Sequence, residues 1–314
     1  MESATVTTVR PLSRRRSRGL SERRLATLMV SPSVVLIVLV AAYPIGYAVW
    51  MSMHEYSVRV AGLSRWAGPL GLDNYRAALS DPAFWDAVKT TFVFTGASVG
   101  LELVLGMVMA LTMHMAFRGQ GVLRTVILVP WAVLTVVTAI MWQTMFDPQL
   151  GFVNNLLGAV GLTNDTVWLG TQPQALIVMI VADVWKTAPF MALLILAGLQ
   201  VIPGDVYEAA RVDGATAWQR FVRITLPLLR PAILVALIFR TLDALRLFDL
   251  PFVLTKGAHG TETLSLLSYQ TFAQNRIYGL GSALAVLTFI IVMSVSFAYI
   301  RIVGGNLRGL EEER

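Results

Sequence analysis

The chain has 314 residues, of which 56% are hydrophobic and only 14% are charged, whereas an average soluble domain is about one quarter charged. It contains no cysteine, which excludes disulfides, thiol nucleophiles and cysteine-ligated metals. Its three histidines do not occur at the paired spacings of metal ligands, so neither a metal site nor a cofactor is expected. The net charge of +6 is less informative than the positions of the charged residues along the chain.

Long apolar stretches dominate the sequence. A helix needs about 20 apolar residues, at about 1.5 Å rise per residue, to cross the hydrocarbon core of a membrane. Six stretches meet this requirement: Leu25–Trp50, Thr90–Met113, Val122–Met145, Ala175–Leu199, Leu226–Leu250 and Gly279–Ile302. The sequence therefore predicts an all-α integral membrane protein with six transmembrane helices.

Arginines are concentrated in residues 1–24, directly ahead of the first span. A basic run can bind nucleic acid, but arginines that precede an apolar helix ordinarily hold that end of the chain in the cytoplasm. We expect residues 1–24 to be a disordered cytoplasmic tail and not a cleaved signal peptide, because the apolar run is too long. Six spans then place residues 304–314 in the cytoplasm as well, and Lys and Arg are more frequent on that side.

The first outer loop, residues 51–89, contains the signature of a helix start. Asp81 can accept a hydrogen bond as an N-cap, and Pro82 suits the first helical position. Phe84 and Trp85 follow and would anchor the segment at the membrane interface. The sequence predicts a short interfacial helix in this loop. In the second span, the Gly96-x-x-x-Gly100 spacing is typical of close helix packing.

The cytoplasmic loop of residues 200–225 has more local structure signals than a simple linker needs. Pro203 ends the fourth span, and Asp205 with Glu208 has the spacing of a capping box that begins a short helix. Gly214 then ends this helix, because glycine tolerates a left-handed backbone. The pattern predicts a helix, a turn and a second helix on the cytoplasmic face.

Thr216 can cap the second helix, which continues toward the fifth span. Ala209 and Ala210 leave the first helix narrow on one side. Such a helix can occupy a groove of another protein, or it can rest on the lipid surface. Its small apolar bulk and nearly balanced charge favour the docking interpretation.

The residues of this loop resemble the EAA loop of ATP-binding-cassette (ABC) importer permeases. The matching positions are Glu208-Ala209-Ala210, Asp213-Gly214-Ala215, Phe221, Ile224, Leu226-Pro227 and Pro231. The resemblance implies a type I importer permease fold with its core in residues 90–303. It further implies that residues 203–218 are a coupling segment. In that family this coupling loop docks into a separate ATPase, and the implied docking residues are Glu208, Ala209, Ala210, Asp213 and Gly214.

Other runs are similar to the sugar (maltose/trehalose-type) branch of the family. They are Leu72–Tyr75, Val184–Lys186, Pro189-Phe190, Ala197–Leu199 and Tyr278-Gly279. The resemblance implies a second permease subunit, two ATP-binding subunits and an extracellular sugar-binding protein as partners. It implies import of a sugar, with trehalose expected and another oligosaccharide or glycerol-3-phosphate as alternatives. Thr255–Ala258 departs from the glycine-rich run of sugar permeases, so no contact is transferred to that loop.

The chain lacks a nucleotide site of its own. A P-loop requires a glycine-rich run followed by lysine, and none of Lys89, Lys186 and Lys256 follows such a pattern. ATP hydrolysis is therefore assigned to a partner. An ion-driven transporter would be expected to show inverted repeats, and a membrane enzyme would need clustered reactive side chains on a loop. A scaffold without transport activity is a further alternative.

Charged residues also occur inside the spans, where an unshielded charge is unfavourable by several kcal/mol. The candidates for a translocation path are Glu102, Asp183, Lys186, Arg240, Asp243 and Arg246. From the helical rise, all of them fall between the outer surface and the midplane. They could line a polar cavity that opens outward. Alternatively, the charges of the fifth span could pair along their own helix at i,i+3 spacing.

Overall fold

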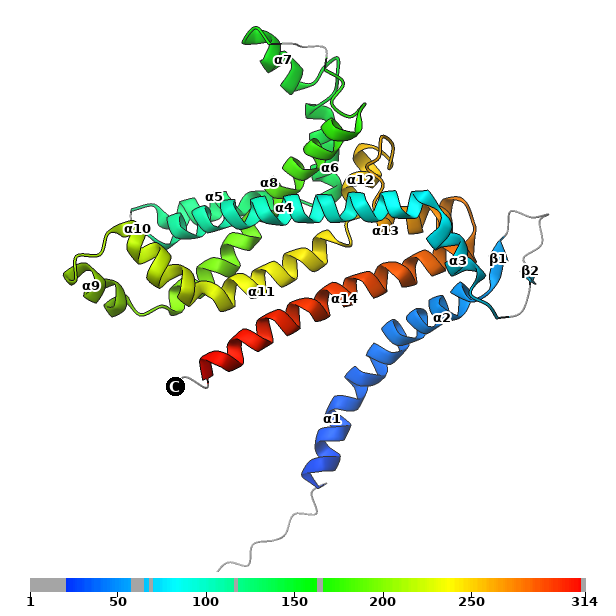
Figure 1. Ribbon diagram of the computed structural model, residues 1–314, viewed down its shortest axis with the longest axis horizontal. Helices are drawn as coiled ribbons and strands as arrows, with labels where there is room; N and C mark the ends of the chain where they lie inside the picture. Colours follow the sequence, from blue (N-terminus) through cyan, green and yellow to red (C-terminus); the bar gives the residue numbers. More distant parts are fainter. Residues whose placement is uncertain (1–20, 58–64, 68–69, 116–117, 163–165, 312–314) are drawn as a thin grey trace, which may run out of the picture. The chain divides into compact units, whose positions relative to one another are not determined.

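The computed structural model describes residues 21–57, 65–67, 70–115, 118–162 and 166–311 (Figure 1). These described residues divide into two units, one that ends at Tyr47 and one that begins at Ala48. Most of the predicted basic tail, residues 1–20, lies outside the described residues. Within them, five helices are long and apolar enough to cross a membrane, and a bent helix pair raises this number to six.

The first predicted span is a helix. It consists of α1 (Glu22–Ile37), a π-helical turn η1 (Val38–Ala42) and α2 (Tyr43–Ser52). The π turn comes just before Pro44, which has no N–H to donate and so interrupts the regular hydrogen-bond ladder.

The segment after α2 contains the only strands among the described residues. Strand β1 (Glu55–Ser57) pairs antiparallel with β2 (Arg65–Ala67), with Tyr56 opposite Trp66. Helix α3 (Asp73–Ser80) follows. The Asn74 side chain attaches α3 to the end of α2, because its Nδ2 donates to the carbonyls of Ser52 and His54, both at 2.9 Å.

The second span begins earlier than the expected Thr90. Helix α4 runs without interruption over Pro82–His114. The predicted cap is confirmed, since the Asp81 carboxylate accepts from the amide of Ala83 at 2.9 Å. Phe84 and Trp85 therefore belong to the first turns of the spanning helix, and the short separate helix of this loop is α3.

The third span is not the single helix expected over Val122–Met145. Two helices, α5 (Gln120–Ala132) and α6 (Thr135–Met145), meet at an angle of 88°. Pro130 lies in the last turn of α5, where it cannot donate a backbone hydrogen bond. Val133 then leaves the helical conformation (φ −74°, ψ 136°). The span is thus broken at this point.

The remaining spans agree with the expected ranges, with shifted ends. Helix α8 covers Gln172–Val201, α11 covers Leu226–Ala244, and α14 covers Tyr278–Glu311. The shorter elements are α7 (Phe152–Ala159), α9 (Gly204–Val212), α10 (Ala217–Arg220), η2 (Phe221–Thr225), α12 (Asp249–Leu254), α13 (Leu264–Tyr269) and η3 (Gln270–Gln274). Helix α11 ends at Ala244 and Leu250 lies in α12, but both belong to the apolar stretch Ala217–Leu254, which is long enough to cross a membrane and contains the expected fifth span.

The core lies where α8 packs against α4 and α11. Met191, Ile195 and Leu229 are fully buried there. A Cβ added to Gly106 would come within 2.8 Å of Met191 Cγ, so glycine permits the close approach of α4 and α8. The Gly96-x-x-x-Gly100 spacing does not mark such a contact, since no described atom outside the local helix backbone lies within 4 Å of either added Cβ.

Candidate functional site

The first helix of the coupling loop is α9, which begins immediately after Pro203. The predicted capping box is wrong. Pro203 is the N-cap (φ −62°, ψ 137°), and no side chain caps the helix. Because Gly204 is already helical, Asp205 lies inside the first turn. There its negative charge complements the helix dipole instead of capping an amide.

The end of α9 is confirmed at Asp213-Gly214. Gly214 has a left-handed backbone (φ +78°). The amide of Ala215 donates to the carbonyl of Ala210 at 2.9 Å, and the amide of Gly214 donates to that of Arg211 at 3.1 Å. This bond pair is a Schellman motif. It reverses the chain and directs it back toward the spans.

The second helix begins with the predicted Thr216 cap. Gln219 N donates to Thr216 Oγ1 at 3.3 Å, and Thr216 N donates to Gln219 Oε1 at 2.8 Å, which completes a reciprocal capping box. Helix α10 then continues through η2 into α11 without a break. The coupling loop is therefore connected to the fifth span by continuous helix.

The coupling loop lies at the ends of α8 and α11 and presents an uncovered surface (Figure 1). Four of the expected docking residues are exposed and Ala210 is half-buried; the exposed ones are Glu208, Ala209, Asp213 and Gly214. Val212, at the end of α9, is 88% exposed. The Glu208–Arg211 ion pair, at 3.5 Å, is also exposed and adds little stability. This surface has the mixed apolar and charged chemistry of a protein contact.

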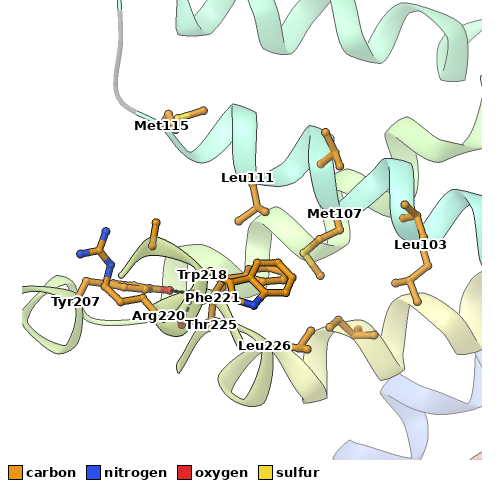
Figure 2. A pocket seen from close by; sticks show the side chains of 14 residues that line it. Leu103, Met107, Leu111, Met115, Tyr207, Trp218, Arg220, Phe221, Thr225 and Leu226 are labelled. Carbon is orange, nitrogen blue, oxygen red and sulfur yellow. Dashed lines mark hydrogen bonds between the residues drawn. The ribbon is translucent and has the colours of Figure 1, made fainter. Parts of the chain in front are cut away.

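A hydrogen bond that the sequence did not indicate links α9 to the spans. Tyr207 Oη lies 3.1 Å from Thr225 Oγ1 (Figure 2). It joins the middle of α9 to the last residue of η2, directly before α11. A displacement of α9 would thus be transmitted to α11 through this bond as well as through the chain.

The second candidate region is the ion cluster, defined as Glu102, Asp183 and Arg240. Arg240 Nε donates to Glu102 Oε2 at 2.6 Å, and its Nη2 donates to Glu102 Oε1 at 2.8 Å and to Asp183 Oδ2 at 3.1 Å. Glu102 is completely buried, Arg240 is 2% exposed and Asp183 is 5% exposed. The cluster joins three helices, α4, α8 and α11.

Two hydroxyl groups complete the cluster. Ser98 Oγ donates to Asp183 Oδ2 at 2.5 Å, and Thr187 Oγ1 lies 2.6 Å from Glu102 Oε1. Sequence reasoning missed both. A detectable signal existed on α4, where Thr91, Thr95, Ser98 and Glu102 recur every three or four residues and form one buried polar stripe.

The other predicted path residues are not brought into this cluster core. Asp243 pairs with Arg240, but its side chain is 69% exposed. Arg246 is exposed, and its Nε donates to the Leu242 carbonyl at 3.1 Å. Lys186 is half-buried and forms no ion pair within the described parts of the chain. Among the described residues, ion pairing along the fifth span itself is limited to Arg240 and Asp243. The other ion pairs of Arg240, with Glu102 and Asp183, run between helices.

Comparison with known protein families gives a match over residues 102–303. The matching family is described as "Binding-protein-dependent transport system inner membrane component". The matched region contains the coupling loop and all three members of the ion cluster.

Curated relatives match almost the whole chain. The trehalose transport system permease protein SugA of Mycobacterium tuberculosis is 42% identical over 311 residues, which cover 99% of this chain and 98% of the relative. The trehalose/maltose transport system permease protein MalF of Thermococcus litoralis is 41% identical over 283 residues, covering 90% and 94%.

Solved structures support the fold. A chain in the crystal structure of a bacterial ABC transporter involved in the import of the acidic polysaccharide alginate matches with a TM-score of 0.78 at 23% identity. The match covers 89% of this chain and 94% of that chain. The family match and the apolar helices make the protein a multi-pass component of the cytoplasmic membrane. The chain belongs to the family of inner membrane components of binding-protein-dependent ABC transport systems.

Proposed function

We propose that this chain is a permease subunit of an ATP-driven importer and that the imported sugar is trehalose. The supporting observation is the 42% identity to a trehalose permease across 99% of the chain. The second trehalose-related relative, at 41% identity, supports the same sugar class. The two relatives cover both the coupling loop and the helices that carry the buried charges.

The energy source is a separate ATPase, and this subunit is not itself an enzyme. The exposed residues Glu208, Ala209, Asp213 and Gly214, with half-buried Ala210, form its docking surface. Two ATP-binding subunits close when they bind ATP, and α9 passes that movement to α11. A second permease faces this one across the path, and an extracellular sugar-binding protein delivers the substrate.

The path runs along the exposed side of α8 and α11, with both chain termini in the cytoplasm. Asp243 and Arg246 are exposed and Lys186 is half-buried, so these side chains are accessible to a hydrated sugar. The buried ion cluster holds the walls of the path together. Alternating access then moves helices that remain joined by Arg240.

The test is ATPase stimulation of the reconstituted complex by its binding protein. We expect trehalose-loaded binding protein to stimulate hydrolysis and uptake more than the same protein offered maltose or glycerol-3-phosphate. Stimulation by another ligand, without any by trehalose, would refute the sugar assignment but not the importer. Uptake that survives ATP depletion and stops with an ionophore would refute the importer itself.

A further inference from the structure

A large apolar groove separates the C-terminal half of α4 from the coupling loop. Its volume is about 970 Å³. Leu103, Met107 and Leu111 of α4 form one wall, and Trp218, Phe221 and Leu226 are among the residues opposite (Figure 2). Figure 2 shows the indole ring of Trp218 near Met107 and Leu111.

Apart from the indole N–H of Trp218, the polar side-chain groups of the groove come from Tyr207, Arg220 and Thr225. The hydroxyls of Tyr207 and Thr225 bond to each other. Arg220 also lines the groove, and its Nη1 donates only a long bond of 3.5 Å to the Ala215 carbonyl. Arg220 forms no ion pair with any described carboxylate. The groove thus combines a long apolar wall with an unneutralised cation at its rim.

We propose that this groove binds an anionic phospholipid, with an acyl chain along α4 and the phosphate at Arg220. A sugar does not fit this chemistry, because the wall offers almost no hydrogen-bonding groups to replace those lost from water. The volume is in the range of about 300–1,000 Å³ that is usual for small-molecule sites. Basic pockets between spans on the cytoplasmic side bind anionic headgroups.

The proposal rests on the proposed function in one respect, the cytoplasmic location of the coupling loop. There the inner leaflet provides anionic lipid, and the exposed ring of Trp218 suits the membrane interface. A lipid in the groove touches α4, η2 and α11 at once. It therefore stabilises the position of the segment that transmits movement from the coupling loop to the fifth span.

The test measures phospholipid retained by the full transporter complex. The complex is equilibrated with vesicles of phosphatidylglycerol and phosphatidylcholine, extracted in mild detergent and examined by native mass spectrometry. Arg220→Gln should weaken phosphatidylglycerol retention about fivefold, since one basic residue at an anionic surface is worth about that factor. Arg223→Gln, a change of an exposed arginine in the same segment that does not line the groove, is the matched control and should retain lipid as the unchanged chain does.

A second pair of variants tests the apolar wall. Leu111→Trp fills the groove and should reduce retention of both lipids, whereas Val126→Trp places the same ring on an exposed site of α5 and should not. Equal retention by Arg220→Gln and Arg223→Gln, or by the two tryptophan variants, would overturn the proposal. So would a photo-cross-linker at Met107 that captures a protein subunit instead of lipid. Because retention is measured without transport, a complex that binds lipid but moves no trehalose would refute only the proposed function.

Discussion

At the scale of single residues, Gly214 shows how strongly one backbone angle can restrict a position. Its φ of +78° is left-handed, and no described atom outside its immediate neighbours lies within 4 Å of a Cβ added there. A side chain at this position would therefore be opposed by backbone strain alone and not by a clash. The strain acts at the turn that sets the direction of α9.

We expect Gly214→Val to uncouple ATP hydrolysis from transport. A left-handed conformation is disfavoured by about 1–2 kcal/mol for residues other than glycine, and a shift of about 1.4 kcal/mol changes an equilibrium tenfold. Sugar uptake should thus fall by about tenfold while the protein remains in the membrane. The control is Gly204→Ala, at a helical glycine of α9 that also has open space around it. Normal uptake by Gly214→Val would contradict the coupling role.

Arg240 is the residue whose loss should destabilise the fold most. Replacing it with Met leaves the Glu102 and Asp183 carboxylates buried without their cation, which destabilises a protein by about 3–5 kcal/mol. Unfolding of the purified protein in detergent measures this change. Arg246→Met, at an exposed position two residues beyond the end of α11, should stay within about 0.5 kcal/mol. Equal effects of the two substitutions would show that the ion cluster does not stabilise the helix contacts.

At the scale of elements, prolines illustrate why helix breaks are difficult to predict. Pro189 in α8 and Pro231 in α11 lie inside continuous helices, whereas Pro130 lies at the 88° break between α5 and α6. Membrane helices tolerate proline when neighbouring groups satisfy the freed carbonyls. The sequence shows each proline but not the groups that pack around it and can satisfy the freed carbonyls. For this reason the sequence predicted an unbroken third span.

The segment before α13 should respond to pH through Glu262. Burial raises the pKa of this carboxyl above its ordinary value, and the negative charge of Asp81 adds to the increase. A carboxyl whose pKa is higher in the folded than in the unfolded state destabilises the fold when it ionises. This segment should therefore lose stability as pH rises from the ordinary glutamate pKa through the raised value. Hydrogen exchange of residues 262–274 should accelerate over that window.

Glu262→Gln should remove this pH dependence, because glutamine does not titrate. Glu55→Gln, outside this segment, serves as the control and should keep the pH dependence of the unchanged chain. If exchange in Glu262→Gln accelerates with pH as much as in the unchanged chain, after correction for the intrinsic exchange rate, Glu262 is not the responsible group.

At the scale of the whole molecule, burial separates the charged residues into two groups. Glu102, Asp183 and Arg240 are inaccessible and bind three helices together, while Asp243 extends from the same cluster with a 69% exposed side chain. A sugar moving through the bundle could contact only the second kind of residue.

Thiol labelling tests this division, and the absence of native cysteine makes the background low. Asp243→Cys should react with a membrane-impermeant thiol reagent added from outside in at least one transport state, and trehalose should slow the reaction. Ala188→Cys, at a position of α8 that is 1% exposed, should not react. An unreactive Asp243→Cys in every state would remove α11 from the path.

The sequence by itself determined that the chain is a membrane protein. It also determined where the turn between the two helices of the coupling loop begins and ends. Both are local properties, because hydropathy adds up along one helix, and the Thr216 cap and the Gly214 turn depend on residues within a few positions of each other. Only the tertiary structure decided the ion cluster and the groove along α4. Glu102 and Arg240 are 138 positions apart, and their contact depends on the rotation and packing of whole helices. The sequence showed that these charges needed partners, and the packing of α4, α8 and α11 determined which ones they found.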